Sequence, residues 1–371
     1  MRKALFQLHL WLGVVVGLLW ALQGLTGASL VFHREMDRWA VGSVAPNPMV
    51  SMDRIVVAAK ARTGAPVAMV AIEGKRGDIL NVHLAGEAPR QLQIEAATGR
   101  PLRLRDHDPS TPLDGSAWRW VYLLHESLLL HDRGETLIGI SGLLLFTSLL
   151  TGIWLGFPKR RQWRQALGWR GWKSVRARLF GWHRLTGIIA GTLLLITVPG
   201  GIWMIFAGEL RPKLALLVEH QLPFKPTPVA ELGEIIAPQQ ALDAARVVFP
   251  NAAFVRVTMP TPAAPVYAIR LRQPDEIRTW SGVTSVTLDA ATGRRLHTYD
   301  AASAPLSNRL ADAAFSVHSA EIAGFGGRIL LMLAGLSLPV LYVTGLWAWW
   351  RKRRPRRREV ASRGACATSS A

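Results

Sequence analysis

Four long apolar stretches interrupt an otherwise polar sequence. Each is close to the roughly 20 residues that a helix needs to cross the hydrocarbon core of a bilayer, and none contains a charged residue. The pattern therefore predicts an α-helical membrane protein with four transmembrane helices. The stretches are residues 10–32, 137–157, 185–207 and 329–350.

Two longer segments between these stretches have the patterns of small α+β domains. Each begins with a run of helical periodicity and continues with short runs that alternate or are wholly apolar, as strands do. A Thr-Gly turn follows in both segments, where Gly99 and Gly293 can take a positive φ at little cost. We expect a helix over a small antiparallel sheet in each segment. The expected helices are 52–62 and 239–248, and the expected strands are 67–72, 79–84, 91–95, 254–259, 266–271 and 285–288.

The two halves of the chain resemble one another, which indicates an internal duplication. The motif H-x3-G-x3-G begins at His9 and again at His183, at the start of the first and third apolar stretches. We therefore expect two repeats of one topology, each made of a helix, a soluble domain and a second helix. Further matches are Glu95-Ala-Ala-Thr-Gly-Arg100 with Asp289-Ala-Ala-Thr-Gly-Arg294, His125 with His318, and Thr151-Gly-Ile-Trp154 with Thr344-Gly-Leu-Trp347.

Positive charge is concentrated beside the apolar stretches. The chain has 44 Lys and Arg against 25 Asp and Glu, and most of its net charge of +19 lies in the loop 159–178 and the tail 351–371. Short cytoplasmic loops hold the positive excess of membrane proteins, so both termini and this loop are expected in the cytoplasm. Anionic headgroups account for such charges, which makes membrane lipid the expected partner and leaves no role in nucleic-acid binding.

The sequence contains no motif for a cysteine-ligated metal, an iron–sulfur cluster, a nucleotide or a flavin. Its only cysteine is Cys366, which excludes a disulfide framework, a cysteine-ligated metal and an iron–sulfur cluster. No G-x-G-x-x-G follows a strand and no Walker loop is present, so nucleotide and flavin sites are not expected.

The repeated histidines are the candidates for chemistry. Because each half crosses the membrane an even number of times, the pseudo-twofold axis runs along the membrane normal. His9 and His183 would then face one another near the cytoplasmic surface, and His125 and His318 near the outer surface. Two imidazoles on opposite sides of an iron porphyrin form a six-coordinate haem suited to electron transfer. Glycines one turn apart would leave room for the flat macrocycle: Gly13, Gly17, Gly187 and Gly191.

Simpler roles for the same residues remain open. An interfacial histidine can simply bond to water or headgroups, and glycines at this spacing can serve close helix packing. Copper or zinc on the four histidines is less favoured because the pairs lie at opposite faces. His125 stands well before the second apolar stretch, so His131 is a second candidate for the outer ligand. The remaining histidines, His33, His83, His107, His220 and His297, are expected at interfaces or surfaces.

The sequence resembles the PepSY-associated transmembrane family over about residues 5–355. The resemblance rests on the repeated (Asp/Glu)-Ala-Ala-Thr-Gly unit, the histidine-led helices, Thr26-Gly27 and the aromatic, basic segment 347–354. It implies a multi-pass protein of the bacterial inner membrane that is similar to di-haem reductases of ferric siderophores.

On this resemblance the chain is expected to bind two haem b groups through the four paired histidines. Electrons would pass from a cytoplasmic reductase or a quinol to a periplasmic ferric siderophore, which would release Fe(II). The alternative is a non-redox member of the family that binds peptides or regulates a peptidase, in which the histidines are structural and the protein is colourless.

The expected organisation has eight segments, with a PepSY-like α+β domain outside the membrane in each repeat. They are a first transmembrane helix at 1–36, a first PepSY-like domain at 37–117, an interfacial segment and second helix at 118–158, a basic cytoplasmic loop at 159–178, a third helix at 179–210, a second PepSY-like domain at 211–314, a fourth helix at 315–351 and a basic tail at 352–371.

Overall fold

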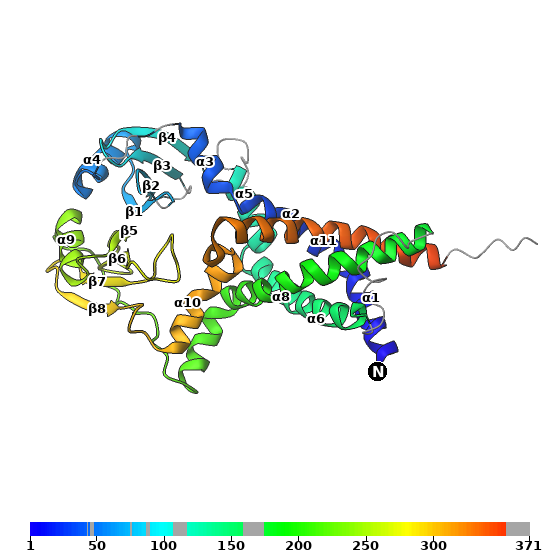
Figure 1. Ribbon diagram of the computed structural model, residues 1–371. Coiled ribbons are helices and arrows are strands. Elements are labelled where there is room, and N and C mark those ends of the chain that lie inside the picture. Colours follow the sequence, from blue (N-terminus) through cyan, green and yellow to red (C-terminus); the bar gives the residue numbers. More distant parts are fainter. Residues whose placement is uncertain are drawn as a thin grey trace, which may run out of the picture.

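The computed structural model is a long helical bundle with a β-sheet domain at one end (Figure 1). It describes residues 1–42, 44, 48–74, 76–86, 90–106, 117–158 and 174–353. The N-terminus lies at the end of the bundle away from the sheet. Three features of the sequence fall outside the described residues: most of the basic loop (159–173), most of the tail (354–371) with Cys366, and His107.

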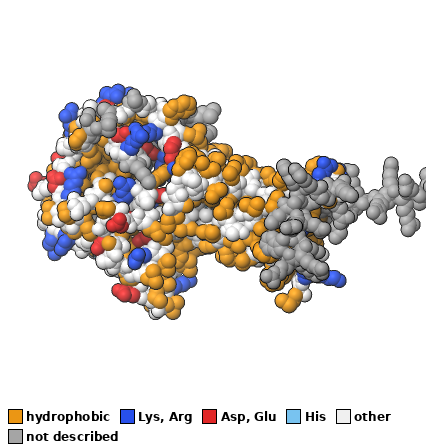
Figure 2. Space-filling model, in the orientation of Figure 1, with side chains coloured by type: hydrophobic (Ala, Val, Ile, Leu, Met, Phe, Trp, Pro, Cys, Tyr) orange, Lys and Arg blue, Asp and Glu red, His pale blue; other side chains and the backbone are white. Residues whose placement is uncertain are grey.

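Long apolar helices form the bundle. Among the described residues, three helices are long and apolar enough to cross a membrane, and there are four spans if one bent helix pair is counted as a span. Hydrophobic side chains gather over the bundle (Figure 2), as a surface in contact with lipid requires. The chain is therefore a membrane protein. The helices are α6 (His131–Gly156), α8 (Val175–Ala215), α11 (Gly324–Arg353) and the pair α1 (Arg2–Val15) and α2 (Gly17–Leu30).

The first apolar stretch is not the single straight helix that the sequence suggests. Helices α1 and α2 meet at an angle of 63° at Val16. Gly13 and Gly17 flank this break, and glycine lowers the cost of leaving helical geometry. A side chain at Gly17 would also collide with α11, because its Cβ would lie 2.6 Å from Cδ2 of Tyr342. The bend lets α1 pack against α6 as well as α11.

Two short helices carry the chain from the sheet into the bundle. Helix α5 (Ala117–Ser127) packs on α2 and α6, and α10 (Leu306–His318) packs on α8. Tight turns, in which several residues have a positive φ, separate α5 from α6 and α10 from α11. His125 and His318 therefore lie on the short helices α5 and α10 and not on the apolar helices that follow. A single-turn 3-10 helix, η2 (Glu321–Ala323), follows α10. The left-handed residues are Leu128, Leu129 and His131 after α5, and Ala320 and Gly324 after α10.

The strands form one sheet, whereas the sequence predicts two separate ones. In the described part of the chain, eight strands follow the order β4-β3-β2-β1-β5-β6-β7-β8, and all neighbours are antiparallel. The strands are β1 (Val67–Ile72), β2 (Ile79–Leu84), β3 (Arg90–Glu95), β4 (Pro101–Asp106), β5 (Ala253–Thr258), β6 (Val266–Arg272), β7 (Ser285–Asp289) and β8 (Arg295–Tyr299).

The two halves of the sheet join through strands that would otherwise be exposed edges. Strand β1 pairs with β5, and the pairing places Val70 opposite Val257. Both side chains are fully buried. An unpaired edge is a site for aggregation, so pairing the two edges removes this hazard. Each half also has a last strand that the sequence did not predict, β4 and β8, directly after the Thr-Gly turn.

The two faces of the sheet differ in polarity. Helices α4 (Met52–Thr63) and α9 (Pro238–Val248) cover the face away from the bundle and enclose an apolar core (Figure 1). The face toward the bundle carries polar side chains, among them Asn81, Gln91 and Gln93. Helix α3 (His33–Val41) contacts this face through its side chains. A buried ion pair joins α3 to β4, because Arg105 Nη1 donates to Asp37 Oδ2 at 2.9 Å.

Candidate functional site: two histidine pairs

The structure brings His9 and His183 together at the end of the bundle far from the sheet. We call them the distal pair. His9 comes from α1 and His183 from α8, and their ring centroids are 6.2 Å apart with an interplanar angle of 73°.

A second pair lies at the end of the bundle that faces the sheet, and we call it the sheet-side pair. His125 of α5 and His318 of α10 also have ring centroids 6.2 Å apart, with an interplanar angle of 41°. His131 begins α6 and is exposed, so His125 is the histidine that meets His318.

One ring nitrogen of each histidine is bound to a neighbouring helix. Nδ1 of His9 donates to the carbonyl oxygen of Ser148 at 3.0 Å, and Nδ1 of His183 donates to that of Leu341 at 3.1 Å. A carbonyl only accepts, so these bonds place the proton on Nδ1. They leave Nε2 with a free lone pair, which is the form that binds a metal.

The sheet-side pair has the same arrangement. Nδ1 of His318 donates to the carbonyl oxygen of Thr197 at 3.0 Å. Nδ1 of His125 lies 3.0 Å from Oγ1 of Thr26, whose own hydroxyl donates to the carbonyl oxygen of Leu22 at 2.9 Å. Because that hydroxyl proton is in use, the oxygen accepts from Nδ1. All four histidines are therefore oriented with Nε2 available.

A glycine lies against the ring of each histidine. A Cβ atom at Gly152 would lie 2.7 Å from Cε1 of His9, and one at Gly27 would lie 2.9 Å from Cε1 of His125. These glycines let the imidazole rings approach the backbone of the next helix. We call them the glycine seats: Gly152 for His9, Gly345 for His183, Gly27 for His125 and Gly201 for His318.

The glycine seats follow the internal repeat. Gly27 and Gly201 stand equally far along the chain after His9 and His183, and Gly152 and Gly345 equally far after His125 and His318. Sequence reasoning did not assign them this contact. The repeated Thr-Gly at three of the four positions is the signal that could have found them.

The spacing of both pairs fits two imidazoles on opposite sides of one metal ion. A nitrogen bound at about 2.0 Å puts its ring centroid roughly 3.1 Å from the metal, so two such centroids lie about 6.3 Å apart. Both pairs measure 6.2 Å. Each pair offers two imidazoles, and the described part of the chain has no cluster of three or more His, Cys, Asp or Glu that could hold a metal ion.

A large cavity surrounds the distal pair. Its volume is about 1300 Å³, and Gly13, Gly17 and Gly187 line it together with the two histidines. Gly13 has no atom within 4 Å of a built Cβ, so it faces open space. Gly191 differs from its expected role, because it packs against Ile153 and Leu149 of α6. Three of the four predicted glycines therefore border the cavity.

Basic and aromatic side chains complete the cavity. Arg2 and Lys3 of α1 and Arg184 of α8 line it, as do Trp20 and Tyr342. A flat apolar ligand with anionic substituents suits such a lining, with its plane among the rings and its charges against the basic residues.

The other histidines lie away from the two pairs. His33 begins α3, with its ring 6.3 Å from that of Trp118. His220 Nδ1 lies 3.0 Å from Oγ of Ser307, and His297 stacks on Phe224 at 5.5 Å. His83 lies on β2.

Comparison with known proteins identifies the family. The family model described as the PepSY-associated TM region matches residues 6–352, which is nearly the whole chain. A search of curated proteins finds no match.

Proposed function

This chain belongs to the PepSY-associated TM region family, and from that premise we propose that it is a two-haem electron-transfer protein. It lies in the bacterial inner membrane with both termini in the cytoplasm, and its sheet domain is periplasmic. The observation that carries the proposal is the equal 6.2 Å spacing of two histidine pairs whose Nε2 atoms are all available.

The chain's own residues would hold a haem b at each pair. His9 and His183 would bind one iron, and His125 and His318 the other. A haem held by two histidines would supply one-electron transfer when bound. The Nδ1 hydrogen bonds fix the orientation of each ring and raise the basicity of Nε2. At the distal pair, Arg2, Lys3 and Arg184 line the cavity and would offer positive charge to the haem propionates.

The placement of the pairs supports transfer across the membrane. His183 and Gly201, the seat of His318, lie on the same helix, α8. At about 1.5 Å of rise per residue, the two pairs are roughly 27 Å apart along it. This is close to the roughly 30 Å thickness of the hydrocarbon core. One pair therefore serves each face of the bilayer.

The proposed acceptor is a ferric siderophore on the periplasmic side. A cytoplasmic reductase or a quinol supplies the electron, and each Fe(III) takes one electron to become Fe(II). Oxygen chelators hold Fe(II) less tightly than Fe(III) because Fe(II) is the softer ion. Iron is then released while the chelator stays intact.

The haem content of histidine variants tests the proposal. We expect purified wild-type protein to show a Soret band and two haem b per chain. His183→Ala should lose the distal haem and keep the sheet-side one, and His318→Ala should do the opposite. His131→Ala, an exposed histidine, is the matched control and should keep both. A colourless wild-type protein, or unchanged haem content in both pair variants, would refute the proposal and favour a non-redox peptide-binding or peptidase-regulating protein.

A further inference from the structure

Arginines gather on the face of the sheet that looks toward the bundle. In β6, Tyr267 and Ile269 are fully buried in the core under α9, and alternation turns Ala268 and Arg270 to the opposite face. Arg256 of β5 pairs with Ala71 beside the central Val70 and Val257. We define the arginine cluster as Arg256, Arg270 and Arg278, with Arg34 of α3 and Arg119 of α5 at its margin.

Within the described part of the chain, the central arginines lack carboxylate partners. No Asp or Glu oxygen there lies within 4.0 Å of the guanidinium of Arg256, Arg270 or Arg278. Nε of Arg278 is buried without a hydrogen bond to any described residue. Arg256, Arg270 and Arg278 are half-buried. A partly desolvated guanidinium without an anion is unfavourable, so the cluster has capacity for one.

The nearby carboxylates are engaged in other contacts. Tyr299 donates its hydroxyl proton to Asp312. Glu321 accepts from Oγ1 of Thr279 at 2.8 Å and from the backbone N–H of Trp280 at 2.6 Å. Glu276 accepts from the backbone N–H groups of Gln273 at 2.8 Å and Val283 at 2.5 Å. Glu276 and Glu321 stabilise the loop after β6 through these bonds, and Asp312 lies on α10. None of the three forms an ion pair with the arginine cluster within the described part of the chain.

The charges of the central arginines act on one another and on a nearby histidine. Burial, together with the charges of Arg256 and Arg278, lowers the pKa of Arg270 to about 10. Burial also lowers the pKa of Arg256. The pKa of His83 is lowered by burial and by the charges of Arg119 and Arg256. Like charges held together in this way are relieved when an anion binds between them.

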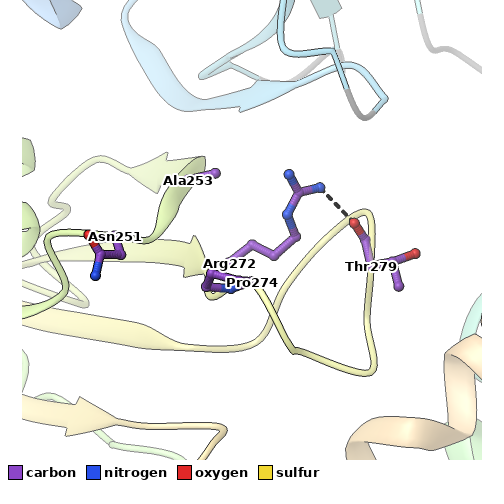
Figure 3. A pocket seen from close by; sticks show the side chains of 5 residues that line it. All are labelled: Asn251, Ala253, Arg272, Pro274 and Thr279. Atoms are coloured by element: carbon purple, nitrogen blue, oxygen red, sulfur yellow. Dashed lines mark hydrogen bonds between the residues drawn. The ribbon is translucent and has the colours of Figure 1, made fainter.

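The face that bears the arginines is open to solvent. Ala268 is exposed although it lies in the middle of β6, between two fully buried neighbours. A cavity of about 440 Å³ opens at the ends of β5 and β6, where Arg272 extends toward the loop after β6 (Figure 3). Nη1 of Arg272 donates there to the carbonyl oxygen of Thr279 at 2.6 Å. Arg272 lies on the same face of β6 as Arg270, so solvent reaches this face at Ala268 and beside Arg272.

The arginine cluster lies next to the helices that carry the sheet-side pair. The guanidinium of Arg278 lies 4.7 Å from the ring centroid of Phe315, which precedes His318 by one turn of α10. The guanidinium of Arg119 lies 5.3 Å from the ring of Tyr122, which precedes His125 by one turn of α5. One helical turn rises about 5.4 Å, so the cations lie just beyond the proposed electron exit.

We propose that the arginine cluster binds the electron acceptor and selects an iron chelate of net negative charge, of the catecholate or carboxylate class. The inference rests on the proposed function and adds the charge class of the substrate. Guanidinium groups bind such oxygen anions through paired N–H donors, and the apolar rings of Phe315 and Tyr122 lie beside them.

Binding of redox-inert gallium(III) chelates tests the inference without electron transfer. The probes are a trianionic hexadentate tricatecholate and an uncharged hexadentate trihydroxamate of gallium(III), titrated into the full chain in zwitterionic nanodiscs. We expect the trianionic probe to bind more tightly, with an affinity that falls as salt is added. Arg256→Gln and Arg270→Gln should each weaken its binding about tenfold or more, and Arg256→Lys should restore part of it.

Controls separate this inference from the proposed function. Arg294→Gln removes an exposed arginine in the turn before β8 and should bind the trianionic probe as the wild type does. Equal binding of the uncharged probe, or unchanged binding in both glutamine variants, would overturn the inference. Haem content is recorded in each preparation. A haem-free wild-type protein that still binds the trianionic probe through Arg256 and Arg270 supports the inference and refutes the proposed function.

Discussion

At the scale of single residues, the four paired histidines share one environment. Each has its Nδ1 bonded to an adjacent helix and its ring against a glycine seat. Both features restrict rotation of the imidazole, so Nε2 is held in place before any ligand binds. Such preorganisation lowers the entropic cost of binding.

The glycine seats give the first prediction at this scale. Gly152→Ala places a Cβ 2.7 Å from Cε1 of His9, closer than van der Waals contact allows, so the ring must move. We expect loss of the distal haem, or a changed absorption spectrum for it, with the sheet-side haem unaffected. Gly208→Ala is the control because a Cβ there meets no atom within 4 Å. Identical spectra for Gly152→Ala and the wild type would rule out the contact.

Thr26 gives a second prediction. Thr26→Val keeps the shape of the side chain but removes the oxygen that accepts from His125. An unsatisfied buried donor costs about 1–3 kcal/mol, and the imidazole loses a bond that tunes its basicity. The redox midpoint potential of the sheet-side haem should change while that of the distal haem stays constant. Thr26→Ser, which keeps the hydroxyl, should behave as the wild type, and a shift of equal size in both variants would contradict this role.

The sequence identified the histidines but not their surroundings. His9, His183, His125 and His318 were found because the repeat pairs them. The glycine seats depend on which helices touch, and spacing along one helix does not reveal that. Gly191 repeats Gly17 in sequence yet packs against α6 instead of lining the cavity. Equivalent sequence positions therefore need not have equivalent neighbours.

At the scale of elements, breaks in helices position the ligands. The bend at Val16 separates α1 from α2, and left-handed turns separate α5 from α6 and α10 from α11. Hydropathy predicted where the apolar stretches lie but not the breaks at Val16, Leu128 and Leu129, because these are apolar residues with no turn signal. Tertiary contacts with neighbouring helices override the local preference there. Gly324, between α10 and α11, has a positive φ of 64° and is a glycine at which the sequence could indicate a bend.

The turn after α5 gives a third prediction. Gly134 lies against the carbonyl oxygen of Ser127, and a Cβ would overlap that atom. Gly134→Ala should destabilise the protein by about 1–3 kcal/mol through overpacking, and thermal unfolding measures the effect. Gly326→Ala, in the first turn of α11, meets no atom within 4 Å and should leave the melting temperature nearly constant. Equal melting temperatures in the two variants would contradict the close contact at Gly134.

At the scale of the whole molecule, one sheet joins both repeats above the bundle. Pattern reasoning found six of the strands because they alternate or are wholly apolar. It missed β4 and β8, although Leu102-Arg103-Leu104-Arg105 of β4 alternates as a strand does. It also gave no account of how the two halves dock. The pairing of β1 with β5 is a long-range contact between strands of different repeats, and no local signal encodes it.

Docking of α3 on the sheet gives a fourth prediction, which depends on pH. Burial alone would raise the pKa of Asp78, but the hydrogen bonds and charge of Arg38 outweigh it and hold the pKa below its ordinary value. The pKa of an aspartate in the unfolded chain is about 3.9. Because the pKa of Asp78 is lower in the folded protein, its ionised carboxyl stabilises the fold above about pH 3.9, and this stabilisation is lost as the pH falls through the folded-state pKa.

Thermal unfolding between pH 6 and pH 3 measures this effect. Asp78→Asn should lower the melting temperature at pH 6, and the difference from the wild type should shrink toward pH 3. A difference between the two proteins that stays constant over this range would show that ionised Asp78 does not contribute to docking.

The central claim is that the two histidine pairs hold two haem groups, one at each end of the bundle. The pyridine haemochrome assay on purified wild-type protein measures the ratio of haem b to polypeptide most directly. The account predicts a ratio of two, because the pairs have the same spacing and the same free nitrogen. A ratio of one or zero, in protein expressed with sufficient haem, would contradict it.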